Sequence, residues 1–279
     1  MKQIPQHDFI IAPTDTDSIS FCKKDGSEFS KEELRSLLKE LNEISPDLIT
    51  WEDDGYYKKV LVLRAKNYIL YDPTKEKEKD RKQIKGSAFK SSTKEPAMMQ
   101  MMQEIVNAIL DDKQDTILSI YEKYVDEALN IKDINRWSQK KTVTEAVMNC
   151  RGYEKYSPES LKLKGIRPNE TNVWDAIKHE ELIQQGEKYY LYPAILSTEE
   201  IRSEKTLKSG KVKVSVKYEH KLGLKMANKW TKGDENVKKL LERIYDTISI
   251  FGTVLDLTQF TNYSLVKNYK TLLESKNSA

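Results

Sequence analysis

The sequence predicts an α+β fold, in which antiparallel strands and a covering helix precede a mainly helical region with a few strands. Two short apolar segments, Phe9–Ile11 and Ile19–Phe21, flank a polar turn, a pattern typical of a β-hairpin. Leucines then recur at helical spacing, and longer segments with helical periodicity dominate the rest of the chain. We expect two domains, 1–93 and 94–279.

Composition indicates a polar, globular protein. Of the 279 residues, 33% are charged and 38% hydrophobic, with a formal net charge of +3. A membrane-spanning helix needs about 18 consecutive apolar residues, and no apolar run approaches that length. The first residues also lack the apolar core of a signal peptide. The two cysteines, Cys22 and Cys150, do not suggest a disulfide framework. We therefore expect a soluble, cytoplasmic protein with no membrane partner.

The polar turn contains the first candidate site. Asp15 and Asp17 stand two residues apart between the two apolar segments. Aspartate often caps a turn without any further role. A hairpin tip with carboxylates can also hold a hard cation such as Mg²⁺ and leave room for phosphate oxygens.

Helix and strand signals alternate after the hairpin. Ser30 and Glu33 form a capping-box pattern, and leucines follow at helical spacing over residues 34–41. Residues 57–63 and 68–71 are expected to be strands. A basic turn joins these two strands, with the sequence Arg64-Ala65-Lys66-Asn67.

Several helices are expected beyond residue 93. Ser92 or Thr93 suits the N-cap of the first, Glu95 favours its first turn, and its methionines form a stripe that we interpret as core. The first two helices, joined by a short polar link, should form an antiparallel pair. The expected ranges are 94–110, 115–129, 169–182 and 237–248 for helices, and 188–192 for a strand.

A lysine-rich segment follows the expected strand at 188–192. Its lysines are Lys205, Lys208, Lys211, Lys213, Lys217 and Lys221, and they are interleaved with Val212, Val214, Val216 and Tyr218. The alternation favours a strand with one basic face, which suits contact with phosphates. It is equally typical of an edge strand that lysines protect from pairing with other chains.

Three segments resemble motifs of family-B DNA polymerases, in the order that this family has them. The turn Asp15-Thr16-Asp17-Ser18 between apolar strands is similar to the third palm motif. Lys66 and Tyr68 match the Lys-x-Tyr motif, which holds the primer terminus in that family. Lys85-Gly86, followed by Ser91-Ser92-Thr93, resembles the passage from palm to thumb beside the DNA duplex in phage-type members.

Two positions depart from the family pattern. Ala65 stands where many members have an additional lysine, so one phosphate or minor-groove contact would be absent. Thr14 replaces a small residue, often glycine, that usually precedes the first aspartate. Beyond about residue 115 the resemblance is only topological.

The resemblance implies template-directed nucleotidyl transfer with two Mg²⁺ ions, which stabilise the attacking and leaving oxygens. It makes Asp17 the principal ligand, bridging both ions, and Asp15 a supporting acid. The implied DNA-binding residues are Lys66, Tyr68, Lys85, Gly86, Ser91, Ser92 and Thr93. The implied partners are primer-template DNA and a deoxynucleoside triphosphate.

Other parts of the family's site have no match. Only fourteen residues precede Asp15, whereas the family takes another essential aspartate, the lysine and asparagine of the fingers, and the exonuclease acids from upstream. We therefore expect the C-terminal portion of a split viral polymerase, with the end of the palm over 1–93 and the thumb over 94–279. A second polypeptide would supply the exonuclease, the fingers and the first palm motifs.

Two other functions would also account for parts of the sequence. One is a non-catalytic DNA-binding remnant or regulator derived from a polymerase thumb. The other is a glycosyltransferase that uses Asp-x-Asp to hold a metal and a nucleotide sugar. The latter requires a nucleotide-binding segment before the motif, which fourteen residues cannot provide.

Overall fold

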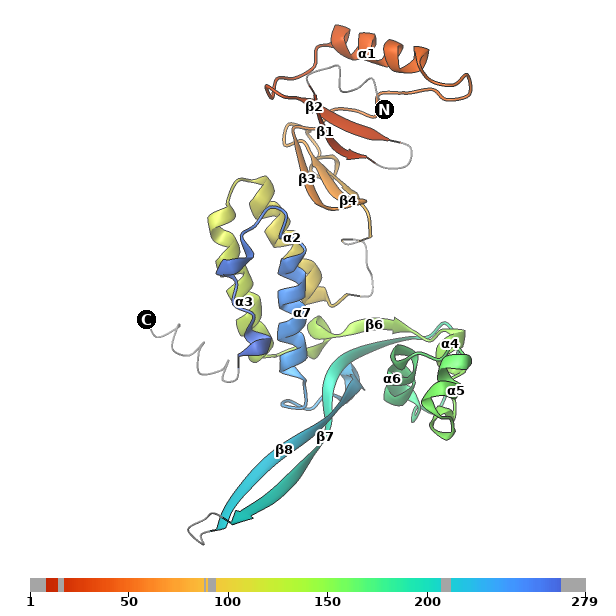
Figure 1. Ribbon diagram of the computed structural model, residues 1–279, viewed down its shortest axis with the longest axis vertical. Helices are drawn as coiled ribbons and strands as arrows, with labels where there is room; N and C mark the ends of the chain where they lie inside the picture. The colour runs from red at the N-terminus through yellow and green to blue at the C-terminus, as the bar shows by residue number, and fades with distance from the viewer. Residues whose placement is uncertain (1–8, 15–17, 88, 90–93, 207–211, 267–279) are drawn as a thin grey trace. The chain divides into compact units, whose positions relative to one another are not determined.

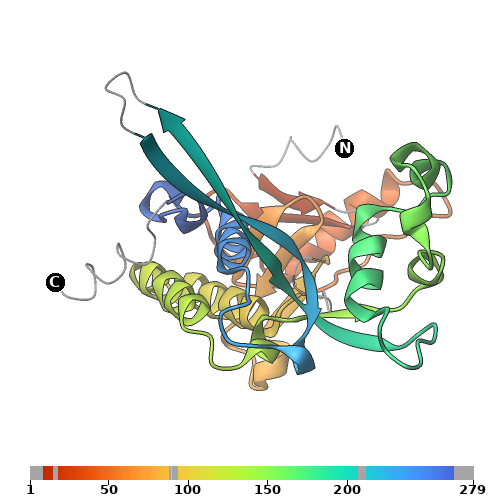
Figure 2. The same ribbon diagram turned by 90° about the horizontal axis from the view of Figure 1, so that it is seen from below.

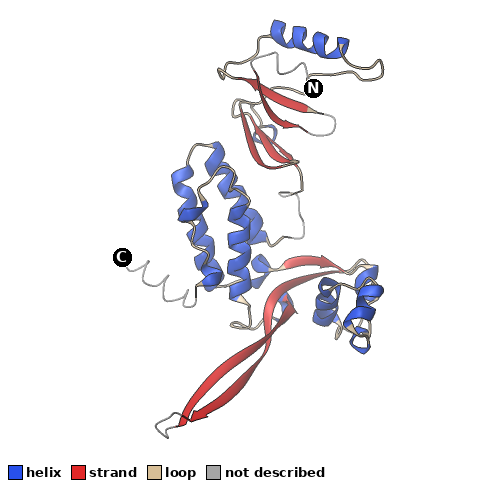
Figure 3. Cartoon of the chain, viewed as in Figure 1, coloured by secondary structure: helices blue, strands red, loops and turns tan. Residues whose placement is uncertain are grey.

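The computed structural model describes residues 9–14, 18–87, 89, 94–206 and 212–266 (Figure 1). The chain divides into two compact units. The first comprises residues 1–90 and 250–255, and the second residues 91–249 and 256–279. Helices and antiparallel sheets are both present (Figure 3), which confirms the predicted α+β class.

The first unit begins with the predicted hairpin. Strands β1 (Phe9–Thr14) and β2 (Ile19–Lys23) pair antiparallel, with Ile11 opposite Phe21. Phe9 and Phe21 stack with ring centroids 5.2 Å apart, and the ring of Phe29 lies edge-on to both, at 5.3 and 5.7 Å. This aromatic cluster anchors the end of the hairpin that lies away from its turn.

Helix α1 (Lys31–Glu43) has the predicted capping box. The Glu33 backbone N–H donates to Ser30 Oγ at 3.1 Å, and the Ser30 N–H donates to Glu33 Oε2 at 2.7 Å. Lys23 Nζ of β2 also donates to Glu33, at 2.7 Å, and so connects the helix to the hairpin. This hydrogen bond from Lys23 is the largest cause that lowers the pKa of the Glu33 carboxyl.

A three-stranded sheet completes the first unit. Its strands, in the order β3-β4-β5, are Lys59–Arg64, Asn67–Tyr71 and Lys82–Lys85. The first two strands were predicted and the third was not. Every residue of β4 is buried. Residues 250–255 also belong to this unit, and Thr253 Oγ1 donates to the Val62 carbonyl at 3.0 Å.

Three helices form the core of the second unit: α2 (Pro96–Leu110), α3 (Ile117–Leu129) and α7 (Val237–Ser249). The α2 methionines Met98, Met101 and Met102 are at most 2% exposed, which confirms that they are core residues. On α2, Glu104 accepts hydrogen bonds from Lys123 Nζ at 2.9 Å and from Tyr124 Oη at 3.0 Å, both on α3. No helix in the described ranges is both long and apolar enough to cross a bilayer.

The predicted N-cap of α2 is wrong. Glu95, rather than Ser92 or Thr93, occupies this position, and its side chain makes no capping hydrogen bond. Pro96 is the reason, because proline suits the first helical position and restricts the preceding residue to extended backbone. Glu95 accordingly has φ −62° and ψ 137°.

A second sheet and three short helices form the remainder of this unit. The sheet has the order β6-β7-β8, with strands Gln139–Thr142, Lys188–Thr206 and Val212–Met226. The helices are α4 (Glu145–Met148), α5 (Pro158–Leu163) and α6 (Pro168–Ile177). A single 3₁₀ turn occurs in the first unit at Glu78–Asp80, and others in the second unit at Gln114–Thr116, Ile134–Trp137, Tyr153–Lys155, Ala227–Lys229, Leu257–Gln259 and Tyr263–Leu265.

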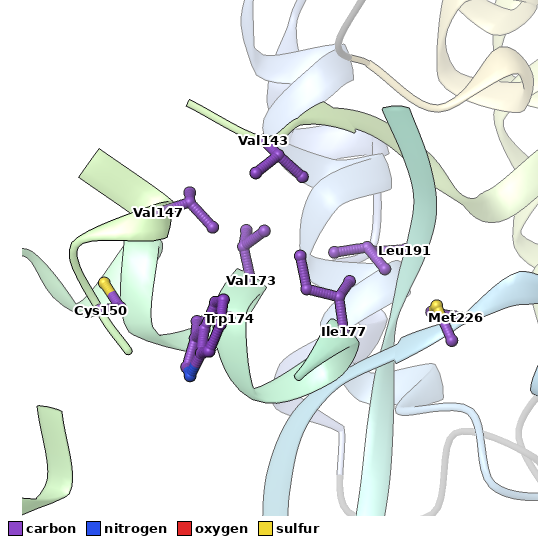
Figure 4. Packing of buried hydrophobic residues seen from close by; sticks show 8 residues of the cluster. All are labelled: Val143, Val147, Cys150, Val173, Trp174, Ile177, Leu191 and Met226. Carbon is purple, nitrogen blue, oxygen red and sulfur yellow. The ribbon is translucent and has the colours of Figure 1, made fainter. Parts of the chain in front are cut away.

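Helices α4 and α6 pack against the sheet through one apolar cluster (Figure 4). It consists of Val143, Val147, Cys150, Val173, Trp174, Ile177, Leu191 and Met226. The helix predicted over 169–182 corresponds to α6, but it ends at Ile177. Leu182 lies beyond this end, so its assignment to the helix was wrong, and it is 64% exposed.

The two long strands β7 and β8 continue well beyond the cluster (Figures 1 and 2). They pair without interruption from Ser197 opposite Lys221 to Thr206 opposite Val212. We call residues 197–206 and 212–221 the ribbon. Within β7, sequence periodicity predicted a strand only over 188–192, because the ribbon half of β7 has no apolar alternation. The alternation in β8 had indicated a strand there.

Candidate nucleic-acid interface

The structure confirms strands on both sides of the predicted metal-binding turn, whereas Asp15 and Asp17 themselves lie outside the described residues. The two strands pair as far as Thr14 opposite Ile19, with a register shift between Ile11 and Thr14. The connection that contains both aspartates is therefore only four residues long. The aromatic cluster and the Lys23–Glu33 ion pair fix the opposite end of this hairpin.

Within the described ranges, no group of three or more His, Cys, Asp or Glu side chains could hold a metal ion. Asp15 and Asp17 are not among the residues searched. Their carboxylates fit the oxygen ligands that Mg²⁺ prefers, and one intervening residue keeps them near one another in the chain. Two carboxylates supply only part of a two-ion site, because two close divalent ions require several acids to offset their repulsion.

Four of the predicted DNA-binding residues meet at one corner of the β3-β4-β5 sheet. Lys66 lies in the β3–β4 turn, and Tyr68 of β4 is opposite Lys85 of β5. Gly86, which has φ +95°, lies against the same turn. A Cβ atom at Gly86 would be 2.2 Å from the backbone oxygen of Lys66 and 2.6 Å from Asn67 Oδ1. We call Lys66, Asn67, Tyr68, Lys85 and Gly86 together the Lys66 corner.

The corner presents its basic residues, and not its tyrosine, to solvent. Lys66 is exposed and Lys85 is partly exposed, whereas Tyr68 is only 4% exposed. Direct contact of Tyr68 with DNA stays a prediction, and in this chain its ring belongs to the core. Arg64 is exposed and opposite Asn67 across the turn, so it adds a third cation to this surface. Its place in a basic turn was the only sequence signal for it.

The backbone of the corner has an unusual conformation. Lys66 has φ +60°, which is uncommon for a residue other than glycine. Asn67 Nδ2 donates to the Ala65 carbonyl at 3.1 Å and so stabilises the turn. Gly86 permits the close approach of β5 because it has no side chain. The glycine thus brings two sequence motifs that are well separated in the chain onto one surface.

We expect a Gly86→Ala substitution to disrupt this corner. The added Cβ would overlap a backbone oxygen that cannot move independently, in addition to the strain of a positive φ. Together these should cost about 3 kcal/mol or more of unfolding free energy. Urea denaturation measures this loss.

Gly55→Ala is a matched control for this prediction. Gly55 has φ +107°, but a Cβ added there would have no atom within 4 Å, so only backbone strain applies. Equal destabilisation by the two substitutions would contradict the close approach at Gly86.

The start of α2 lies beside a buried ionic cluster. Ser91, Ser92 and Thr93 lie outside the described residues, but Glu95, two residues after Thr93, is 2% exposed. Its carboxylate accepts hydrogen bonds from Arg243 Nη1 of α7 and from Gln139 Nε2 of β6, the latter at 3.1 Å. Desolvation and then the nearby Arg243 charge lower the pKa of Lys141, also on β6. The Glu95 carboxylate thus connects the start of α2 with α7 and β6.

The ribbon shows the alternation that the sequence predicted. Lys217 and Lys221 of β8 occupy one face, and Val214, Val216 and Tyr218 occupy the other. Lys217 Nζ is 2.7 Å from Glu219 on its own face. Both interpretations of the lysines require an exposed basic face, and β8 is an edge strand of its sheet. Lys208 and Lys211 lie outside the described residues.

No protein-family model matches the chain, and no curated protein matches its sequence. The assignment of function therefore depends on the motifs and on their placement in the fold. The structure brings Lys66, Tyr68, Lys85 and Gly86 together. It adds Arg64 to them, and it places the lysines of β8 on a separate exposed face.

Proposed function

We propose that this chain is the C-terminal part of a family-B DNA polymerase, comprising the end of the palm and the thumb. The proposal depends mainly on the arrangement of residues in the Lys66 corner. Two segments that resemble separate polymerase motifs, residues 66–68 and 85–86, share one corner of a sheet although nothing in their local sequences requires it. A chance resemblance would not be expected to bring its matches together.

The chemistry of the proposed activity is an in-line attack of the primer 3′-hydroxyl on the α-phosphate of a deoxynucleoside triphosphate. Mg²⁺ held by Asp17, with Asp15 in support, would stabilise the charge that develops on the reacting oxygens. Lys66, Lys85 and Arg64 would neutralise phosphates of the primer strand. Each residue thus has a role that suits its charge.

The matched residues account for one part of a polymerase site. The proposal therefore includes a second polypeptide, which supplies the exonuclease, the fingers that bind the triphosphate and the remaining palm aspartate. For a viral protein, the two chains would act in the cytoplasm of the host cell.

Primer extension with Mg²⁺ and deoxynucleotides tests the proposal. The chain is assayed alone and then together with the polypeptide encoded immediately upstream of it. We expect synthesis only when both are present. Salt-sensitive binding to primer-template without synthesis in either assay would instead support a non-catalytic DNA-binding protein.

The lysine face of the ribbon should contribute to DNA binding. A double Lys217→Gln, Lys221→Gln variant removes two cations, so the slope of log K against log salt concentration should fall by about 2. Fluorescence anisotropy with duplex DNA at several salt concentrations measures this slope.

A Lys113→Gln, Lys132→Gln variant is the control, because it removes two exposed lysines that lie elsewhere in the second unit. An unchanged slope for the ribbon variant would show that its lysines only protect the edge of the sheet.

A further inference from the structure

The ribbon has an apolar face in addition to its lysine face. Its apolar residues are all on β8, and their exposed fractions lie between 47% and 59%: Val212, Val214, Val216 and Tyr218. Directly opposite three of them on β7 are Glu204, Arg202 and Glu200. Cross-strand partners share a face, so an apolar stripe runs beside a row of alternating charge.

Two physical features indicate that this face is covered in solution. A two-stranded ribbon is at best marginally stable in water, because it has no third strand or helix to pack against. A contiguous exposed apolar stripe is also uncommon on a soluble protein outside an interaction site. The lysine face has no such stripe among its described residues, and its exposed charges are well solvated.

The pattern of the apolar face is complementary to itself. Consider two ribbons stacked face to face about a two-fold axis that runs across the strands, midway between Arg202 and Glu204. Val214 of one copy then lies on Val216 of the other, and Val212 lies on Tyr218. Glu204 of each copy meets Arg202 of the other. Moving one copy by four residues along the strands would bring Val214 onto His220. Val212 would then no longer lie on any of the other copy's four apolar residues.

We propose that two copies of this chain associate through the apolar faces of their ribbons in this arrangement. The occupant of the face is a second copy because the same face provides both the apolar stripe and the opposite charges, as an isologous interface requires. Arg202 already pairs with Glu200 of its own strand at 2.5 Å, which holds the guanidinium on this face. The lysine faces stay on the outside of the dimer.

The size of the face determines the expected strength of association. The ten paired rows of the ribbon, at about 3.3 Å each and two strands in width, give a face of roughly 30 by 10 Å. Two such faces bury on the order of 600 Å², which is below the about 1,200 Å² of stable complexes. We therefore expect a weak, concentration-dependent dimer that is independent of DNA and of any partner polypeptide.

Sedimentation equilibrium of the full chain tests the proposal, over concentrations from about 10 to 500 μM, which span the weak association expected of so small an interface. We expect a monomer–dimer equilibrium that Val214→Glu weakens at least tenfold. Ser215→Glu is the matched control, since it adds the same charge to the neighbouring position on the opposite face. A monomer at all concentrations, or a dimer that resists Val214→Glu, would overturn the proposal.

A charge exchange tests the arrangement itself. Arg202→Glu alone and Glu204→Arg alone place like charges opposite one another across the axis, so each should weaken the dimer. The double variant restores opposite charges and should recover the dimerisation constant of the parent chain. Failure of the double variant to recover, in proteins whose circular dichroism matches the parent, would contradict the proposed pairing.

Discussion

Asp17→Ala should abolish DNA synthesis in the assay with both polypeptides. The lost carboxylate would be the ligand shared by two Mg²⁺ ions, whose stabilisation of the transition state is worth several kcal/mol. A loss of about 4 kcal/mol corresponds to roughly a thousandfold lower rate. Single-turnover primer extension measures this rate. DNA affinity should stay unchanged or increase, because a negative charge near the phosphates is removed.

Two further variants make this result specific. Asp54→Ala removes an exposed carboxylate elsewhere in the first unit and should leave the rate unchanged. Asp15→Ala should reduce the rate less than Asp17→Ala, because its role is to support the principal ligand. Full synthesis by Asp17→Ala would exclude the proposed metal site, even if the chain still binds DNA.

Local signals in the sequence predicted those parts of the fold that neighbouring residues determine. The capping box of Ser30 and Glu33 is an interaction across three residues, and it is present as expected. The methionine stripe of α2 has a helical period, and it is buried. Where two local signals competed, the stronger prevailed: Pro96 set the start of α2 in place of the serine and threonine N-cap candidates.

Features that depend on distant residues could not be predicted from local patterns. Nothing near Gly86 indicates that it lies against Lys66, because the pairing of β4 with β5 creates that contact. The ribbon half of β7 lacks periodicity and becomes a strand only because β8 pairs with it. Tyr68 matched a DNA-binding motif, but burial depends on packing, so its sequence alone could not reveal that its ring is covered.

Glu95→Ala should cause a large loss of stability in the second unit. The Glu95 carboxylate is buried and pairs with Arg243, whose side chain is 22% exposed. Removing one partner of a buried pair costs about 3 to 5 kcal/mol, because the other charge is left without compensation. The partial exposure of Arg243 favours the lower value, about 3 kcal/mol. Urea denaturation followed by circular dichroism measures the loss.

Glu43→Ala is the contrasting control. Glu43 and Lys39 form an exposed pair at 3.7 Å, and the loss of such a pair should cost less than about 1 kcal/mol. A Glu95→Leu, Arg243→Met double variant should recover much of the stability lost in Glu95→Ala, because it removes both charges together. A double variant no more stable than Glu95→Ala would contradict the unpaired-charge explanation.

The pH dependence of Glu95→Ala provides an independent check on the same cluster. Without Glu95, Lys141 loses an interaction that raises its pKa but keeps the desolvation and the Arg243 charge that lower it. The folded protein then binds fewer protons than the unfolded chain between this lowered pKa and the ordinary value of 10.5. Stability should therefore rise with pH across that interval. A Lys141→Met substitution in the Glu95→Ala background should abolish this rise, whereas its persistence would assign the titration to another group.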